Sequence, residues 1–315
     1  MRRFFARARA LHARGVLGIN ERNGGLVLPL NPRRHYPRVD DKLLTKQLAE
    51  AVGIPIPRSL AVVTYHHQLR ELPVLLDELE QFVLKPARGA QGNGIVVITG
   101  IEDGCYRKSS GASLSAMEMR QHVSSTLSGV FSLRGDIDSC LIEERVVLHP
   151  AFAGVARGGI PDVRIIIYRG LPIMAMSRLP TLESDGRANL HQGAIGAGIP
   201  IATGRIAHAA CYNEPVTHHI DTHAPLIGVG IPHWDEVLDL AVRAAEISGL
   251  GYLGVDVVID IARGPLLLEL NARPGLAIQV ANQAGLLPRI RQAENIAGVE
   301  QLSCGERLRI ARELF

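Results

Sequence analysis

The sequence predicts an α+β fold with antiparallel sheets, and two observations support this prediction. Apolar runs rich in β-branched residues occur in pairs separated by short turns, which is typical of β-hairpins. The clearest pairs span residues 82–98, 163–177 and 254–271. Helical periodicity is found between these pairs, so hairpins outnumber βαβ units and antiparallel sheets are expected. The 315 residues, 47% of them hydrophobic, are sufficient for one large domain or two ordinary ones.

The composition excludes several classes of protein. A net charge of +3 and an aromatic content of 4% argue against a nucleic-acid partner. The four cysteines are far apart and form no Cys-x-x-Cys pair, so neither a disulfide framework nor a structural zinc site is expected. No apolar run approaches the length of a membrane span, and basic residues interrupt the N-terminus where a signal peptide would be apolar. These features predict a cytoplasmic protein.

The N-terminal part of the chain is basic. Residues 1–15 predict a helix with an apolar stripe at Phe4, Phe5, Ala8 and Leu11. Peripheral contact of its arginines with an anionic membrane, or docking on a partner, is one interpretation, although packing on its own domain is favoured. Residues 16–38 are rich in glycine and proline and predict irregular chain with short strands.

The remaining elements follow in order. A helix begins at Asp40 and Asp41, whose carboxylates suit its first turn, and it ends before Gly53. Strands are predicted at residues 60–64, 82–86, 95–98, 139–147, 163–168 and 171–177. Further helices are predicted at residues 69–79, 113–128, 233–249, 283–296 and 306–314. Residues 186–200 are glycine-rich and predict an irregular loop.

The stretch 254–275 carries the most distinctive chemistry. Glu269 and Asn271 are two residues apart, so they share one face of a strand. An even loop places Asp256 opposite Glu269, whereas an odd loop turns it to the other face. Two carboxylates and one amide oxygen on one patch suit a hard divalent cation such as Mg²⁺, which also binds phosphate oxygens. A hairpin whose acids face solvent is the alternative, but it leaves Glu269 and Asn271 unexplained inside an apolar run.

A second stretch combines a strand that ends in Lys85 with a loop that contains Gly89, Gly92 and Gly94. Glycines let backbone N–H groups close over a phosphate, and the lysine adds a positive charge. The stretch lacks the Gly-Lys-Ser/Thr of a Walker loop. Taken alone, it suits an ordinary hairpin with a flexible tip equally well.

Two pairs of charged residues are ambiguous in isolation. Glu143 and Glu144 lie in a predicted strand, where they either bind a base and its ribose or make a charged edge, and the edge is favoured. Arg164 and Arg178 suit bidentate contact with phosphate or carboxylate, with surface ion pairing as the alternative.

A histidine-rich run at residues 218–223 stays open as well. If it is a strand, the side chains of His219, Asp221 and His223 share a face, which allows a zinc site. A plain histidine cluster, or a loop near the acceptor site, is the favoured interpretation.

In their order along the chain, these stretches resemble the ATP-grasp superfamily of carboxylate–amine ligases. The branch they resemble is called alpha-L-glutamate ligase-like and is related to the RimK glutamate ligases. The resemblance covers residues 40–280 and implies an ATP-grasp fold, in which two subdomains hold ATP between them. We expect a basic segment at residues 1–39, one subdomain with a glycine lid at 40–147, and a second with the metal hairpin at 148–315.

The resemblance also implies a role for individual residues. The implied ATP-binding residues are Lys42, Lys85, Gly89, Gln91, Gly92, Gly94, Glu143, Glu144 and Val146. The implied ligands of Mg²⁺, for two ions with Mn²⁺ as a substitute, are Asp256, Glu269 and Asn271. The implied catalytic residues are Arg164, Arg178, Asn189 and Arg273. His191 is a candidate general base by residue type and loop position only.

The implied reaction forms an amide through an acyl phosphate, adding glutamate or another amino acid to a peptide or small acceptor. Phosphoryl transfer to a sugar or polyol hydroxyl, and a nucleotide-binding module without turnover, are the alternatives. The family usually has a full α/β domain before this core, and about forty residues before Lys42 are too few for one. We therefore expect a partner protein, a homo-oligomer or a carrier to supply that wall, unless the substrate differs.

Overall fold

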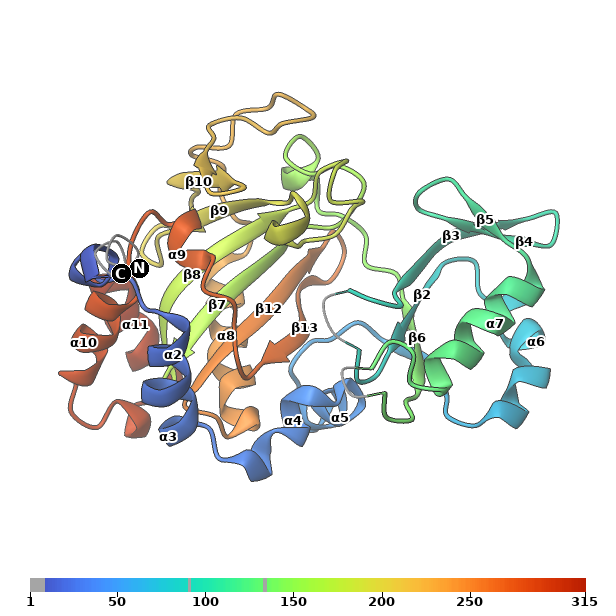
Figure 1. The fold of residues 1–315 in the computed structure, drawn as a ribbon, viewed down its shortest axis with the longest axis horizontal. Coiled ribbons are helices and arrows are strands. Elements are labelled where there is room, and N and C mark those ends of the chain that lie inside the picture. Colours follow the sequence, from blue (N-terminus) through green and yellow to red (C-terminus); the bar gives the residue numbers. More distant parts are fainter. Residues whose placement is uncertain (1–8, 90–91, 133–134) are drawn as a thin grey trace.

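The computed structural model describes residues 9–89, 92–132 and 135–315, and it contains two antiparallel sheets surrounded by helices (Figure 1). The first sheet has six strands in the order β1-β6-β2-β3-β4-β5. The second has seven strands in the order β11-β10-β9-β8-β7-β12-β13. The predicted α+β class with antiparallel sheets is confirmed. No helix within the described ranges is both long and apolar enough to cross a lipid bilayer.

The prediction of short strands in residues 16–38 is wrong, because this segment is helical. Its pieces are α2 (Ile19–Glu21), the π-helical η1 (Arg22–Val27), α3 (Leu28–Leu30), η2 (Arg33–His35) and α4 (Pro37–Asp40). Leu26, Val27 and Val39 are buried in the core beside the second sheet. Packing therefore outweighs the low helical propensity of Gly24 and Gly25.

The predicted basic helix at residues 1–15 is described in part. Residues 9–13 are helical. Of the residues in its predicted apolar stripe, Phe4, Phe5 and Ala8 lie outside the described ranges.

The first sheet and its neighbours follow the prediction closely. Asp41 caps α5 (Lys42–Ala51), because its side chain accepts hydrogen bonds from the backbone N–H groups of Leu43 and Leu44. The elements that follow are β1 (Ser59–Val63), η3 (His66–Arg70), α6 (Leu72–Asp77), β2 (Phe82–Pro86), β3 (Val96–Glu102), β4 (Cys105–Lys108), β5 (Ser113–Leu114), α7 (Ala116–Leu127) and β6 (Cys140–Glu144). The helix predicted from residue 113 begins only after β5, because Ser115 and Glu118 form a capping box.

The second sheet is built around a larger core and is backed by α8, which packs on β12 and β13. Its elements are η4 (Pro150–Phe152), β7 (Asp162–Tyr168), β8 (Leu171–Leu179), η5 (Leu190–Gln192), β9 (Ile195–Ile199), β10 (His208–Cys211), β11 (Glu214–Pro215), α8 (Trp234–Ser248), β12 (Tyr252–Asp260), β13 (Gly264–Asn271), α9 (Ile278–Ala281), α10 (Leu287–Glu294), η6 (Val299–Gln301) and α11 (Cys304–Leu314). The helix predicted at residues 283–296 begins only at Leu287, since Gln283 has a positive φ of 49° that ends the preceding turn.

The expectation that residues 186–200 are irregular is wrong for their second half, which forms β9. Gly196 and Gly198 are required there because α9 approaches the strand closely. A Cβ added to Gly198 would lie 2.5 Å from the Ala281 carbonyl oxygen. The glycines that suggest a loop in the sequence therefore serve helix–sheet packing.

The register of the β12–β13 hairpin depends on a bulge. The three residues 261–263 between the strands make an odd loop, and Asp260 pairs with Gly264. A register shift between Asp256 and Val257 then restores the pairing of Asp256 with Glu269. The bulge places Leu268 and Glu269 together opposite Asp256. The predicted pairing of Asp256 with Glu269 is confirmed, although the even loop expected to produce it is not present.

Candidate active site

A cavity of about 1900 Å³ lies between the two sheets and is bordered by residues of both. The residues predicted to bind a ligand border it, with three exceptions. Gln91 lies outside the described residues, Asp256 has no exposed surface, and Gly94 is not among the described residues that line the cavity. The sequence-predicted residues therefore converge on one place, and the contacts among them give the local chemistry.

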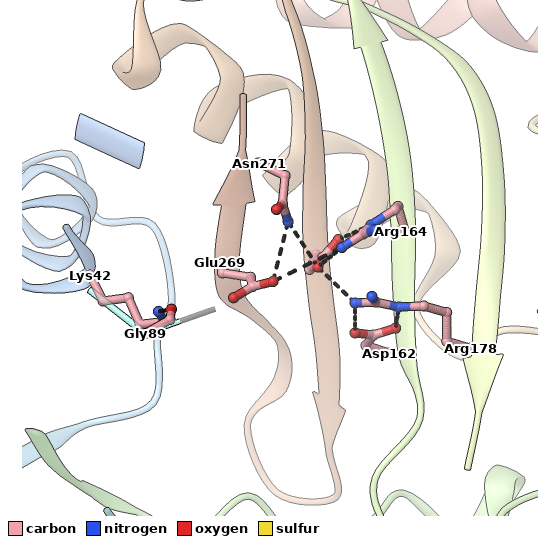
Figure 2. Close-up of polar contacts among 8 residues, drawn as sticks. Lys42, Gly89, Asp162, Arg164, Arg178, Glu269 and Asn271 are labelled. Carbon is pink, nitrogen blue, oxygen red and sulfur yellow. Dashed lines mark hydrogen bonds and ion pairs between the residues drawn. The ribbon is translucent and has the colours of Figure 1, made fainter. Parts of the chain in front are cut away.

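Glu269 and Asn271 lie side by side on β13, as Figure 2 shows, and Asp256 of β12 pairs with Glu269. The amide nitrogen of Asn271 donates to Asp256 Oδ2 and to Glu269 Oε1, at 3.2 Å in each case. Because an amide exchanges its nitrogen and oxygen by a simple flip, the same three side chains can present only oxygen atoms. This donor set fits a hard divalent cation. The Glu269 side chain, 33% exposed, is its accessible end.

Two arginines, Arg164 and Arg178, bind the buried Asp256 carboxylate. Arg164 binds it through Nε at 2.7 Å and Nη2 at 2.5 Å, and Arg178 Nη2 contacts it at 2.7 Å. Arg178 also forms a bidentate pair with Asp162, which sequence reasoning did not single out as a site residue. Burial opposes ionisation of Asp256, but the two guanidinium groups outweigh it and hold the pKa of this carboxyl well below its usual range.

A buried charge triad joins α5 to the first sheet. Lys85 contacts Glu143 at 2.6 Å, and Lys46 contacts the same carboxylate at 2.7 Å. Burial lowers the pKa of Lys46, an effect that Glu143 partly offsets. Lys46 was missed from the sequence, although it lies four residues after Lys42 and so on the same helix face. The side chain of Glu143 thus faces two lysines.

The glycine loop rests on the start of α5. Lys42 Nζ donates to the Gly89 carbonyl oxygen at 2.6 Å, and Arg88 Nε donates to Asp41 Oδ2 at 3.2 Å. Burial lowers the pKa of Lys42. Gly94 has a φ of 76°, and a Cβ there would lie 2.6 Å from the Phe131 ring, so this position requires glycine.

The cavity also has an apolar corner. Val146, Val258 and Leu266 are buried together, with Ile160 and Leu268 packed against them. Glu144 lies beside this corner, where its side chain accepts from Arg263 at 3.0 Å. The β13 bulge places Leu268 of this corner next to Glu269, and both side chains border the cavity.

The loop at residues 185–192 and the end of β13 complete the border. Asn189 Oδ1 accepts from the His191 backbone N–H at 3.0 Å, so Asn189 shapes its own loop. Arg187 borders the cavity too and was not predicted. The Arg273 guanidinium lies 5.0 Å from the centre of the Tyr36 ring, in a cation–π contact.

The strand and zinc interpretations of residues 218–223 are both wrong. Residues 218–223 do not form a strand. His219 is buried, its Nε2 lies 3.1 Å from the Pro180 carbonyl oxygen, and its Nδ1 accepts from Asp221 N at 3.2 Å. Across the described ranges, no three acidic, histidine or cysteine side chains are grouped to hold a metal. The run instead braces the loop that follows β8, where Asp221 accepts from Leu182 N at 2.8 Å.

Comparison with known proteins gives one family and several relatives. The family described as sugar-transfer associated ATP-grasp matches residues 21–295. A probable alpha-L-glutamate ligase of Thioalkalivibrio sulfidiphilus is 26% identical over 267 residues, which are 84% of this chain and 66% of that protein. A protein of the same description from Maridesulfovibrio salexigens is 27% identical over 241 residues, 76% of this chain and 57% of its own length.

Among solved structures, D-cycloserine synthetase DcsG matches with a TM-score of 0.47 and 16% identity, covering 84% of this chain and 71% of that one. The chain spans only 66% and 57% of the lengths of the two probable alpha-L-glutamate ligases.

Proposed function

The chain belongs to the sugar-transfer associated ATP-grasp family, which confirms the ATP-grasp resemblance, and on this premise we propose that it is an ATP-dependent carboxylate–amine ligase. The observation that supports this most directly is the convergence at one cavity of Glu269 and Asn271 with Lys42 and Lys85. Metal donors beside phosphate-binding cations suit phosphoryl transfer from a nucleotide.

The cavity provides separate environments for the parts of ATP. In this proposal the base occupies the apolar corner beside Val146 and Leu268, with Glu144 near its polar edge. The phosphates extend toward Lys42, Lys85 and the glycine loop. A volume of about 1900 Å³ exceeds the roughly 300–1,000 Å³ of an ordinary small-ligand pocket, so a second substrate fits beside the nucleotide.

Mg²⁺ would be held by Asp256, Glu269 and Asn271, and when bound it neutralises phosphate charge. The protein's own task is to position the reactants and to stabilise charge. Arg164 and Arg178 border the cavity beside these ligands and would bind the transferred phosphoryl group. Asp162 and Asp256 hold both guanidinium groups in place, so little reorganisation is needed when charge develops.

The proposed reaction has two steps. A substrate carboxylate oxygen attacks the γ-phosphorus of ATP, the bond to the β-phosphate oxygen breaks, and ADP leaves an acyl phosphate. An amine nitrogen then attacks the acyl carbon, phosphate departs, and the nitrogen loses a proton to give an amide. The amine substrate is glutamate or another amino acid, and the acceptor is a peptide or small molecule. Closure of the glycine loop would exclude water from the acyl phosphate.

A second candidate is phosphoryl transfer from ATP to a sugar or polyol hydroxyl. The description of the matching family, which refers to sugar transfer, favours it. The same cavity and the same cations would serve, because both reactions move a γ-phosphoryl group onto an oxygen atom. The products distinguish the two, as an amide with free phosphate or a phosphorylated alcohol.

The test is a screen for ADP and phosphate release over amino acids, peptides and sugars, with products identified by mass spectrometry. Amide formation with ADP and phosphate supports the ligase, whereas a phosphorylated alcohol supports the second candidate. Binding of Mg·ATP without ADP release in any mixture identifies a non-catalytic module. Glu269→Gln is expected to lower turnover by about 10²-fold. The matched control Glu300→Gln, whose side chain is 65% exposed, is expected to retain turnover.

A further inference from the structure

The segment at residues 17–40 is hydrogen-bonded to the start of β12 and to the chain that follows β13. The buried Asn31 side chain donates to the carbonyl oxygens of Tyr252 and Ala272, at 2.7 and 3.1 Å, and accepts from Tyr252 N at 3.0 Å. Arg22 Nη1 donates to the Pro274 carbonyl oxygen at 2.9 Å. These hydrogen bonds join residues that are more than 200 positions apart in the sequence. They therefore fix the position of the segment relative to the end of β13.

This segment also borders the cavity. Its cavity-lining residues are Arg33, Tyr36, Pro37, Val39 and Asp40. The chain after β13 adds Ala272, Arg273, Gly275 and Ala277 to the same border. The segment is therefore a wall of the cavity.

The cations of this wall differ from those of the phosphate region. Lys42 is bound to a carbonyl oxygen, while Lys85 and Arg164 are bound to carboxylates. Within the described ranges, Arg33 and Arg273 have no acidic partner, and both are exposed. Arg273 instead stacks on Tyr36, which holds the guanidinium plane in one orientation without neutralising its charge. Such a cation is prepared for an anionic ligand.

We propose that Arg33 and the Tyr36-supported Arg273 form a carboxylate-binding wall, so that the amine substrate is recognised by a free carboxylate that does not react. Arg33 and Arg273 contact that carboxylate, and Tyr36 is a positioning residue for Arg273. The inference rests on the proposed ligase function. It makes residues 17–40 of this chain, rather than a second polypeptide, the structure that selects the amine.

The first test compares Arg33→Ala with Arg34→Ala, because Arg34 is outside the set of described residues that border the cavity. Phosphate release is measured with the twenty amino acids and with the corresponding amino-acid carboxamides. In Arg33→Ala the KM for the amine is expected to rise roughly 10- to 100-fold, as for a lost charge-assisted hydrogen bond. The KM for ATP is expected to change less than about twofold in Arg33→Ala, and in Arg34→Ala both the amine KM and the KM for ATP are expected to stay within about twofold of the wild type.

The carboxamides provide the decisive comparison. For the wild type, the KM for a carboxamide is expected to be roughly 10- to 100-fold higher than the KM for the corresponding amino acid. Arg33→Ala is expected to lose this difference. An unchanged amine KM in Arg33→Ala, or an equal rise in the KM for ATP, overturns the inference.

Tyr36 is tested with a conservative pair. Tyr36→Phe keeps the ring and is expected to keep the amine KM, whereas Tyr36→Leu is expected to raise it severalfold, as does Arg273→Lys. Equal amine KM values in Tyr36→Phe and Tyr36→Leu contradict the positioning role.

Protection from phenylglyoxal, mapped by mass spectrometry, needs no turnover and separates the two proposals. Amino acids are expected to protect Arg33 and Arg273, and their carboxamides are not. Absence of this difference overturns the inference whether or not an amide forms. An enzyme that shows protection but makes no amide contradicts only the ligase proposal.

Discussion

Asp256 is fully buried, yet it contacts three of the side chains proposed to act at the second sheet. Its two oxygens are shared among Arg164, Arg178 and Asn271, so one carboxylate joins the proposed metal site to the proposed phosphate site. Removing one member of such a buried network leaves a charge uncompensated. Asp256 and Asp162 together therefore neutralise the charges of Arg164 and Arg178.

Lys46 provides a prediction at the residue scale. Lys46 and Lys85 share Glu143, so loss of the Lys46 charge would draw Lys85 more strongly to the carboxylate and away from a phosphate. We expect Lys46→Met to weaken Mg·ADP binding roughly tenfold, about 1.4 kcal/mol, in isothermal titration calorimetry.

The control for Lys46→Met is Arg309→Met, which removes a cation from the exposed face of α11. If Lys46→Met lowers the melting temperature but leaves the dissociation constant of Mg·ADP unchanged, Lys46 has only a structural role.

The bulge of the β12–β13 hairpin acts at the element scale. It corrects the odd loop, places Glu269 opposite Asp256, and turns Leu268 toward the apolar corner of the cavity. A single irregularity therefore sets both the acidic and the apolar contacts proposed for the nucleotide.

Truncation of Leu268 tests the apolar corner. Leu268→Ala removes about 1–2 kcal/mol of apolar contact with a base placed there, so we expect the KM for ATP to rise roughly 10-fold. The amine KM is expected to stay unchanged. Leu314→Ala, at an exposed leucine of α11, is the matched control. Unchanged ATP affinity in Leu268→Ala would place the base elsewhere.

Asp260 stabilises the turn of the same hairpin and predicts a dependence on pH. Burial opposes its ionisation, but Arg263 and three backbone N–H groups outweigh burial and lower the pKa of Asp260 to about 2. Since an unfolded aspartate titrates near pH ~3.9, this contribution is complete above that pH and is lost as the pH falls through about 2.

We expect Asp260→Asn to lower the free energy of unfolding by about 2 kcal/mol at pH 7, measured by urea titration. The difference from the wild type should shrink as the pH falls from about 4 to about 2. Glu313→Gln, at an exposed glutamate, should change neither the free energy of unfolding at pH 7 nor its dependence on pH. A difference that stays constant down to pH 2 would show that the carboxylate charge is not responsible.

At the scale of the whole molecule, each sheet has its own apolar core. Helix α5 connects them, because Ala49 is buried in the larger core while Lys46 pairs with Glu143 of the first sheet. The cavity between the sheets is thus framed by two independently packed layers.

Asn31 tests how the N-terminal segment contributes to this assembly. Its side chain makes three hydrogen bonds to the chain around Tyr252 and Ala272, and it is only 2% exposed. We expect Asn31→Ala to lower the free energy of unfolding by about 2–3 kcal/mol, because buried backbone groups lose their partners. Urea denaturation measures the change, with the exposed Asn295→Ala as control. Equal stability of the two variants would contradict this account.

The sequence alone determined the features that depend on local chemistry. Asp41 caps a helix, paired apolar runs form hairpins, and Glu269 and Asn271 share a face because strand side chains alternate. The order of the motifs along the chain was sufficient to identify the family.

Only the tertiary structure decided the features that depend on distant contacts. Loop parity alone predicts the wrong face for Asp256, and the bulge that corrects it has no local signal. The glycines of β9 serve the approach of α9, and residues 16–38 are helical because they pack on the second sheet. Lys46 and Asp162 acquire their roles from partners roughly 16 or more residues away, which spacing rules for a single helix or strand do not reach. Local propensity and alternation act over a few residues, whereas burial and close approach are properties of the packed chain.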